Sequence, residues 1–392
     1  MKGIKKYGKA SLLLGIVLAV FLIGCGQPGS GSSCSGSSAQ GWSGFVPYKN
    51  SIIFGSMEGR VIALDPQARA DNKTYPAEGE WHYLIRNVTP GGACGAMGSP
   101  ASGTSTGIYS TPATAGELTY AGTYTGRIYA FNASEGALRW VYPRESFETV
   151  GSIVAPIITD GKSLYIGSSN SKIYSLDAET GDFRWEFKTS DKIWVAPAVD
   201  NGIVYVGNYA GEIFALSAET GKPVWEIKVP SAVSSSLTVY KDCLYFGTFD
   251  RNIYAIDKSS GLERWKYTGG NWFWAQPVVH EGVVYATCLD RKVYALDADS
   301  GREIWQFTAE TPVVASAAVV GKYVYAVCDK GIVYKLDADS GKEISNVYVG
   351  FTVLATPYAR GDMVYVYARD HKVYAVDTSS GVVTWEFSSY LK

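Results

Sequence analysis

Histidine is scarce in this sequence, with three residues in 392, at His82, His280 and His371. They stand at unrelated places in the chain, and no two cysteines have the short spacing of a metal site. No G-x-S-x-G or P-loop sequence occurs, which removes common signatures of hydrolases and nucleotide-binding enzymes. The sequence therefore predicts no catalytic residue, no metal and no cofactor.

An excess of charge of one sign is also missing. Lys and Arg number 35 and Asp and Glu 37, for a net charge of −2. Four of the lysines fall within the first 24 residues, so the remainder is mildly acidic and carries no basic stripe. Such a surface argues against nucleic acid as a partner.

Long apolar runs are absent except for one near the N-terminus, Ser11–Gly24, which has 14 residues. A bilayer-spanning helix needs about 20 residues, so a short apolar run behind four lysines is typical of a secretory signal peptide, here residues 1–24. It ends in Leu22-Ile23-Gly24-Cys25, which resembles a bacterial lipobox. We expect Cys25 to be lipidated. The alternative is an ordinary signal peptide with a cysteine near its end.

The residues after Cys25 fit a membrane anchor. Residues 25–41 are rich in Gly and Ser, nearly uncharged and without apolar periodicity, so we expect a flexible tether. Two or more acyl chains on Cys25 would hold the protein durably on the membrane. Residues 42–392 then form the folded domain.

Aromatic residues and glycine are abundant, with 28 Tyr, 11 Trp and 43 Gly, and they recur periodically. Six copies of one pattern follow at 40-residue steps, an earlier copy lies at 127–140, and a divergent one begins at Arg60 and ends at Trp81. The six read KIYSLDAETGDFRW (172–185), EIFALSAETGKPVW (212–225), NIYAIDKSSGLERW (252–265), KVYALDADSGREIW (292–305), IVYKLDADSGKEIS (332–345) and KVYAVDTSSGVVTW (372–385).

Each copy divides into four strands of five to seven residues joined by Gly, Asp and Asn turns. A single four-stranded unit cannot bury a core, but sheets arranged radially cover one another. No window of 12 residues after position 41 has a helical period. The sequence therefore predicts an all-β, eight-bladed β-propeller of four-stranded antiparallel blades. A solenoid of stacked strands is the rival.

Most of the repeated residues have architectural explanations. An Asp four residues before a Gly can accept backbone N–H groups of a turn, which we favour over metal binding or acid catalysis. A Trp four residues after the Gly is expected to pack between blades and to need one buried acceptor. Ser345 replaces this Trp in the seventh copy, which should weaken that contact. The aspartates are Asp177, Asp257, Asp297, Asp337 and Asp377, and the tryptophans are Trp140, Trp185, Trp225, Trp265, Trp305 and Trp385.

The pattern Tyr-Ala-Leu-Asp-x-x-Thr/Ser-Gly-x-x-x-Trp resembles the tryptophan-docking motif of propellers related to pyrroloquinoline quinone (PQQ) dehydrogenases. The resemblance covers about residues 42–388. On a lipoprotein tether, such a propeller is similar to the BamB family of outer-membrane-protein assembly lipoproteins, which implies a scaffold and not an enzyme. The dehydrogenases use a vicinal Cys-Cys disulfide that this sequence lacks, so quinone chemistry is not carried over.

Two irregular stretches break the repeat. Residues 66–80 lengthen the outer hairpin of the first copy, and residues 86–107 form a long loop that is either functional or a plain decoration. Cys34 in the tether and Cys94 in this loop form a candidate disulfide. Three further cysteines, Cys243, Cys288 and Cys328, are expected to be small buried residues.

The first strand of each copy is expected to line the central channel. Three residues before the position of a proline lie, in successive copies, Tyr109, Ile153, Trp194, Ser234, Trp274, Val314 and Leu354. Trp272 lies two residues before Trp274, and Trp42 takes that place in the first copy. These aromatics could hold a sugar or a peptide, or they could simply plug the channel.

Two functions stay open. The first is a non-catalytic scaffold for a protein partner on the extracytoplasmic side of the membrane, as in outer-membrane protein assembly. The location would be the periplasmic face of the outer membrane, or the cell surface where there is no outer membrane. The second is a carbohydrate- or peptide-binding module that uses the aromatics at the channel mouth, Trp42, Tyr109, Trp194, Trp272 and Trp274.

Overall fold

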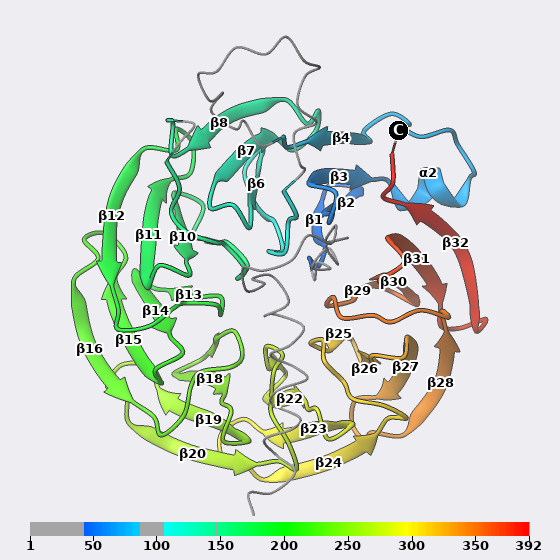
Figure 1. Ribbon diagram of the computed structural model, residues 1–392. Coiled ribbons are helices and arrows are strands. Elements are labelled where there is room, and N and C mark those ends of the chain that lie inside the picture. The colour runs from blue at the N-terminus through cyan, green and yellow to red at the C-terminus, as the bar shows by residue number, and fades with distance from the viewer. Residues whose placement is uncertain (1–42, 87–105, 146–147, 392) are drawn as a thin grey trace, which may run out of the picture. The chain divides into compact units, whose positions relative to one another are not determined.

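The computed structural model describes residues 43–86, 106–145 and 148–391. These residues form eight four-stranded antiparallel sheets arranged as an eight-bladed β-propeller (Figure 1). The predicted fold class is confirmed. We number the blades 1 to 8 in chain order, and within each blade the strands run in sequence order from the inside of the ring outward.

The strands are as follows. Blades 1 and 2 hold β1 (Val46–Tyr48), β2 (Ser51–Gly55), β3 (Arg60–Leu64), β4 (Trp81–Leu84), β5 (Ala113–Ala115), β6 (Leu118–Gly122), β7 (Ile128–Asn132) and β8 (Leu138–Tyr142). Blades 3 and 4 hold β9 (Ile158–Thr159), β10 (Ser163–Gly167), β11 (Lys172–Asp177), β12 (Phe183–Lys188), β13 (Ala198–Asp200), β14 (Ile203–Gly207), β15 (Glu212–Ser217) and β16 (Pro223–Lys228). Blades 5 and 6 hold β17 (Thr238–Tyr240), β18 (Cys243–Gly247), β19 (Asn252–Asp257), β20 (Glu263–Thr268), β21 (Val278–His280), β22 (Val283–Thr287), β23 (Lys292–Asp297) and β24 (Glu303–Thr308). Blades 7 and 8 hold β25 (Ala318–Val320), β26 (Tyr323–Val327), β27 (Ile332–Asp337), β28 (Glu343–Tyr348), β29 (Tyr358–Arg360), β30 (Met363–Tyr367), β31 (Lys372–Asp377) and β32 (Val382–Ser388).

The inner strands are shorter than the sequence predicts, with two residues in β9 and three in β13. The residues that precede them bond partly to the turn between the second and third strands of their own blade and partly to the neighbouring blade. The Tyr209 N–H donates to the Lys192 carbonyl, and the Leu237 N–H donates to the Ala196 carbonyl of the neighbouring blade. The alternating pattern before each inner strand therefore belongs to a segment that connects two blades.

The insertion in blade 1 contains a single helical turn, α2 (Pro66–Ala70), between β3 and β4. Asp65 caps it by accepting the Gln67 N–H, and Pro66 occupies the first turn, where no N–H is needed. The sequence predicts a longer hairpin here and no helix, because one turn is too short to show a helical period. No helix among the described residues is long and apolar enough to cross a membrane.

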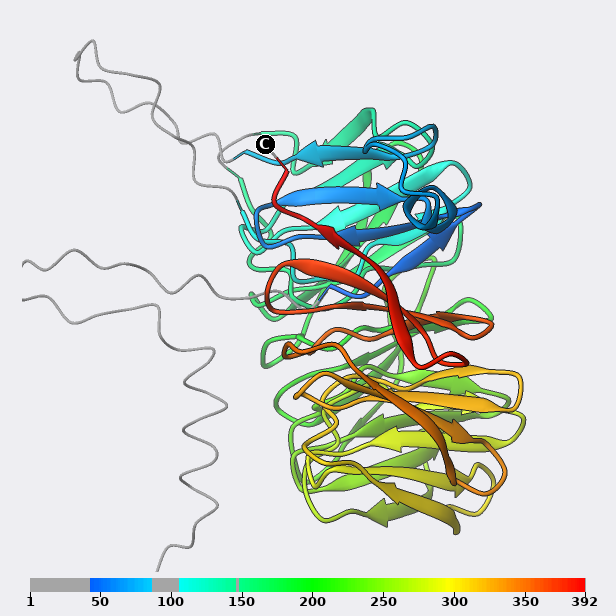
Figure 2. The same ribbon diagram turned by 90° about the vertical axis from the view of Figure 1, so that its right-hand side faces the viewer.

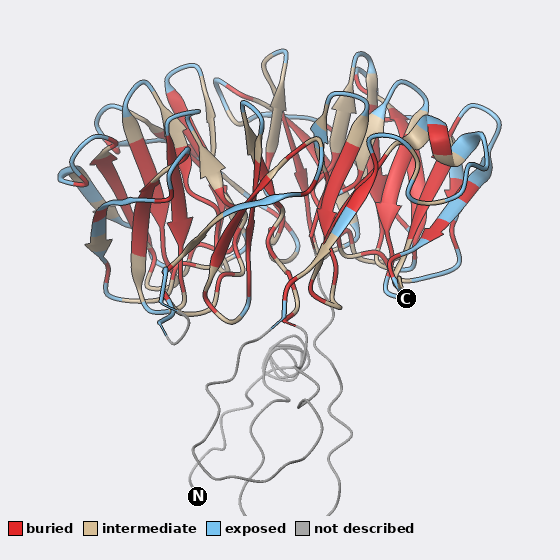
Figure 3. Cartoon of the chain, turned by 90° about the horizontal axis from the view of Figure 1, so that it is seen from above, coloured by how far each residue is buried: buried red, intermediate tan, exposed pale blue. Residues whose placement is uncertain are grey.

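The core lies between the blades. Each hydrophobic cluster of the described residues joins two neighbouring blades, and there is one at every interface of the ring. The middle strands are buried, whereas the turns that join the first strand to the second and the third strand to the fourth are largely exposed (Figure 3). Since each blade is covered by its two neighbours, burial stabilises only the closed ring.

The ring closes without a shared strand. Blades 1 and 8 are each complete sheets and lie side by side (Figures 1 and 2). Phe54 packs on Tyr367 with ring centroids 5.2 Å apart, and His371 Nδ1 lies 2.5 Å from a Glu58 carboxylate oxygen. Packing and polar contacts thus hold the closure.

Candidate functional site

The repeated tryptophans connect each blade to the next. The Trp185 indole N–H donates to the Ala218 carbonyl of blade 4 at 2.9 Å. The indoles of Trp265 and Trp305 likewise donate to an alanine carbonyl of the blade that follows their own. A Cβ added to Gly221 would lie 2.6 Å from the Trp185 ring, and this glycine has a φ of +69°. The glycine is thus required both for the turn and for the approach of the indole.

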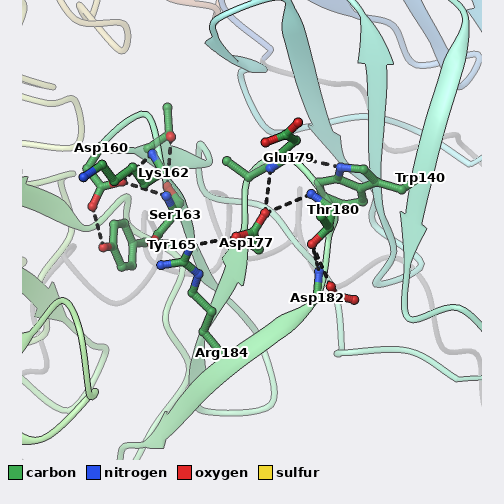
Figure 4. Close-up of polar contacts among 12 residues, drawn as sticks. Trp140, Asp160, Lys162, Ser163, Tyr165, Asp177, Glu179, Thr180, Asp182 and Arg184 are labelled. Carbon is green, nitrogen blue, oxygen red and sulfur yellow. Dashed lines mark hydrogen bonds and ion pairs between the residues drawn. The ribbon is translucent and has the colours of Figure 1, made fainter.

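The repeated aspartates cap turns. In blade 3, Asp177 accepts the N–H groups of Glu179 and Thr180, both at 2.9 Å, and pairs with Arg184 at 2.7 Å (Figure 4). Hydrogen bonds from Arg184 and Thr180 lower the pKa of Asp177 to about 2. Every oxygen of this carboxylate serves the turn, so it is not a candidate acid or metal ligand.

At the interface between blades 7 and 8, other side chains replace the tryptophan that connects neighbouring blades. Ser345 stands in place of the tryptophan and donates to the Thr378 carbonyl at 2.8 Å. Its partner across the strands is Lys335, where the other blades have a small residue. The buried Lys335 ammonium reaches Asp362 of blade 8 at 2.6 Å, and a Cβ added to Gly381 would meet nothing within 4 Å.

The channel-mouth residues lie on the connecting segments and not on the inner strands. Tyr109, Trp194 and Trp274 each stand four residues before an inner strand and are half-buried. Together with the turns between the second and third strands, these segments form one face of the ring, which we call the connection face. Ser234, Val314 and Leu354 take the same place in their blades, and Trp42 lies outside the described residues.

The prediction for Ile153 is wrong. Ile153 is fully buried, as is Ile193 of the next blade, and each would meet a Cβ added to a glycine of the preceding blade, Gly122 and Gly167. The residue in the place of Trp194 is therefore Val154, which is half-buried. In this blade, counting three residues back from Pro156 gives Ile153, one residue before the position equivalent to Trp194. Because neighbouring side chains of an extended segment point to opposite sides, this error selects a buried residue.

Three of the predicted residues come together in one cluster, the aromatic row, which consists of Trp194, Tyr209, Phe249, Trp272 and Trp274. Tyr209 lies 5.3 Å from Trp194 and 5.7 Å from Phe249, measured between ring centroids. Phe249 in turn lies 5.1 Å from Trp272 and 5.7 Å from Trp274. The sequence analysis missed Tyr209 and Phe249, although they stand at the same turn position of adjacent repeats, 40 residues apart. Tyr109 lies apart from the row and packs on Tyr124 at 5.1 Å.

One end of the aromatic row holds a cation. The Lys192 ammonium lies 3.9 Å from the centroid of Trp194 and 4.8 Å from that of Tyr209. Burial, and then the charge of Asp191, raises the pKa of Tyr209, so its phenol stays protonated. The row can therefore offer flat apolar surface and a positive charge to a bound group.

Comparison with known proteins gives the family. The family model of the outer membrane protein assembly factor BamB matches residues 99–193, 191–288, 241–349 and 289–391, well over half of the chain. The chain belongs to the BamB family. The resemblance drawn from the tryptophan-docking motif is thereby confirmed.

Solved structures agree on the fold of this BamB-family chain. BamB from Moraxella catarrhalis has a TM-score of 0.66 and 20% identity, and the match covers 84% of this chain and 95% of that one. The computationally designed protein Ika8 has a TM-score of 0.70 and 14% identity, with coverage of 86% and 96%. At such identities the likeness shows the fold alone. No curated protein matches the chain in sequence.

Reactive groups are sparse in the described part of this BamB-family chain. No group of three or more His, Cys, Asp or Glu side chains there could hold a metal ion. Cys243, Cys288 and Cys328 are buried free thiols, and burial raises the pKa of Cys288 to about 12, which makes it a poor nucleophile. Cys25, Cys34 and Cys94 lie outside the described residues, so the predicted lipid and disulfide stay predictions.

Proposed function

We propose that this protein is a non-catalytic scaffold of the cell envelope, held on the membrane by lipid at Cys25, that binds a protein partner in outer-membrane protein assembly. Membership of the BamB family is the observation that carries the proposal. The aromatic row supports it, because Trp, Tyr and Phe are enriched at the centres of protein interfaces.

The segment that leads into β1 and the aromatic row belong to the same side of the ring. Ser43, the first described residue, stands in the segment that leads into β1, the counterpart of the segment that carries Trp194. Seventeen residues separate Cys25 from Ser43. Such a linker averages about 20–25 Å when flexible and reaches ~60 Å when extended. A lipid at Cys25 would thus keep the connection face near the membrane, where a membrane-embedded partner is accessible.

Site-specific photo-crosslinking in the intact envelope tests this proposal. Phe249→p-benzoylphenylalanine places the probe in the middle of the aromatic row, and we expect it to crosslink a component of the outer-membrane assembly machinery. Phe183→p-benzoylphenylalanine is the matched control, since Phe183 is 50% exposed on an outer strand away from the row. The same products from both positions, or none from Phe249, would count against the proposal.

The second candidate is a carbohydrate- or peptide-binding module at the aromatic row. The continuous run of ring contacts from Trp194 to Trp274 favours it, because such surfaces stack on sugar rings and flat side chains. The double variant Trp194→Ala, Trp274→Ala should abolish binding on glycan or peptide arrays while lowering Tm by less than about 3 °C. Tyr124→Ala, on the same face, is the control and should bind normally. A large loss of stability would mean that the two indoles belong to the core.

A further inference from the structure

A groove of about 610 Å³ lies between blades 2 and 3, on the side of the ring opposite the connection face. Its walls are the turn before β6, the start of β8 and the turn of Glu179 and Thr180 in blade 3. Its volume lies in the range of small-molecule sites. No residue of the aromatic row lines it.

The innermost wall of the groove carries a phenol without a protein partner. Tyr120 is 1% exposed, and its hydroxyl forms no hydrogen bond with another described residue. In four of the six other blades with a tyrosine at this place, the hydroxyl does donate, as Tyr245 does to Ala298 at 3.0 Å and Tyr165 to Asp160 at 2.8 Å. Because Tyr120 lines the groove, its unpaired hydroxyl can bond to a partner from outside the chain.

That hydroxyl is a donor at neutral pH. Burial, and then the charges of Asp177 and Glu179, raise the pKa of Tyr120 to about 12. The phenol therefore keeps its proton under physiological conditions and can donate it to an oxygen atom placed in the groove.

The rim of the groove carries both acceptors and donors. Glu117 and Glu179 supply carboxylates, and Arg139 supplies a guanidinium. All three are exposed, and none forms an ion pair or a side-chain hydrogen bond with another residue that the structure describes. The three side chains are therefore available to a ligand that both gives and accepts hydrogen bonds.

Trp140 adds an apolar edge. It is half-buried, whereas Trp185 and Trp305 are buried, and its indole donates to the Ala178 carbonyl at 3.3 Å, compared with 2.9 and 2.8 Å for those two. Figure 4 shows the turn of Glu179 and Thr180 beside this indole. An aromatic edge, a phenol, a guanidinium and carboxylates thus converge on one groove.

We propose that this groove binds a saccharide. A sugar ring presents C–H groups to an aromatic edge, and each of its hydroxyls both donates and accepts a hydrogen bond. The two carboxylates can accept from such hydroxyls, while Arg139 and the Tyr120 phenol donate to them. A simple anion would be repelled by the carboxylates, and a simple cation would leave the guanidinium and the phenol unused.

The test is a saturation-transfer NMR titration of the full chain, held in a detergent without a sugar headgroup, with trisaccharides of glucose and of N-acetylglucosamine. We expect at least one of the two to bind. Tyr120→Phe should weaken that binding about fivefold, for one lost hydrogen bond. Arg139→Met should weaken it about tenfold, since hydrogen bonds to charged groups are stronger.

Two matched variants locate the site. Tyr165→Phe removes the same hydroxyl one blade further on, where it is already bonded to Asp160, and should leave saccharide binding unchanged. The Trp194→Ala, Trp274→Ala variant should also bind normally, because the aromatic row is a separate surface. If Tyr120→Phe does not fold, the exposed Arg139→Met decides the question alone.

Three results would overturn the proposal. One is that neither trisaccharide binds. Another is that binding is lost in the Trp194→Ala, Trp274→Ala variant and kept in Arg139→Met, which would place the sugar at the connection face. The third is that an uncharged tripeptide binds in an Arg139-dependent manner while no saccharide does, which would make the groove a peptide site.

Discussion

Asp257 and its counterparts show how single residues hold the turns of this propeller. Each accepts backbone N–H groups two or three positions further along the chain, and Asp257 and Asp177 also pair with an arginine on the adjacent outer strand. Asn132 fills the same place in blade 2 and accepts the same two backbone N–H groups without a charge. This position therefore requires a hydrogen-bond acceptor. In Asp177 and Asp257 the negative charge of the side chain also binds an arginine.

The charge makes stability depend on pH in the acid range. Hydrogen bonds from Ser259 and Arg264 lower the pKa of Asp257, and those from Ser379 and Ser380 lower that of Asp377. A folded-state pKa below the unfolded value near 3.8 stabilises the fold above that value, and this stability is lost as pH falls toward the folded-state pKa. We expect the contribution of these carboxylates to Tm to be constant from pH 7 to about 5 and to fall as pH drops below about 4.

The variant Asp257→Asn isolates one of these groups. It should lower Tm by about 1–2 °C at pH 7, and the difference from the parent should shrink as pH falls below the unfolded-state value of 3.8, because unfolding then takes up a proton at this carboxyl. Asp299→Asn is the control, because its carboxylate makes no hydrogen bond that the described structure records. A difference that grows on acidification would contradict the account. Thermal melts followed by circular dichroism at several pH values measure both.

At the scale of the strand pair, blade 7 departs from its neighbours by two linked substitutions. A long residue, Lys335, faces a short one, Ser345, where the other blades pair a small residue with a tryptophan. The lysine side chain is buried, and its ammonium reaches Asp362 of the next blade. The contact that the sequence predicts to be weakened is therefore replaced by an ion pair between the buried Lys335 and the half-exposed Asp362.

Substituting Lys335 and Ser345 by the small residue and the tryptophan of the other blades tests whether the ion pair stands in for the tryptophan contact. Lys335→Ala alone should cost about 1–2 kcal/mol of unfolding free energy, because it removes buried stem carbons and the ion pair. Adding Ser345→Trp should restore at least that amount, since the space above Gly381 is open and the Thr378 carbonyl can accept the indole N–H. Urea unfolding measures both steps. A double variant less stable than Lys335→Ala would show that an indole does not fit this interface.

For the whole molecule, closure is the decisive step, because blades 8 and 1 share no strand. Their interface contains Phe54 and Tyr367, the His371–Glu58 pair, and a hydrogen bond from the Arg60 guanidinium to the Leu391 carbonyl. The apolar part resembles that of every other interface. We therefore expect the closure to be as strong as the rest of the ring.

Phe54 and Phe246 allow a matched comparison. Both are fully buried and stand one residue before the glycine that ends the second strand, Phe54 at the closure and Phe246 in blade 5. Phe→Ala at either position should cost about 3–5 kcal/mol, and the two losses should agree within ~1 kcal/mol. A much smaller loss for Phe54→Ala would mean that the closure opens before the ring unfolds. Denaturant unfolding followed by fluorescence gives both values.

The sequence by itself determined the architecture, because a 40-residue step repeats the same local turn and strand chemistry in six of the eight blades. Asp177, Gly181 and Trp185 could be assigned to turns and blade contacts from spacing alone, since their partners lie at fixed offsets in the same or the next repeat. The family followed from the same pattern.

Only the tertiary structure decided the candidate sites. The aromatic row draws on three blades and on two turn residues, Tyr209 and Phe249, whose meeting with Trp194 and Trp274 depends on how the connecting segments curve around the ring. Ile153 was misplaced because a shift of one residue exchanges the buried side of an extended segment for the exposed one. Periodicity describes what the blades share, whereas these sites arise where side chains of different blades come into contact, and that depends on the closed ring.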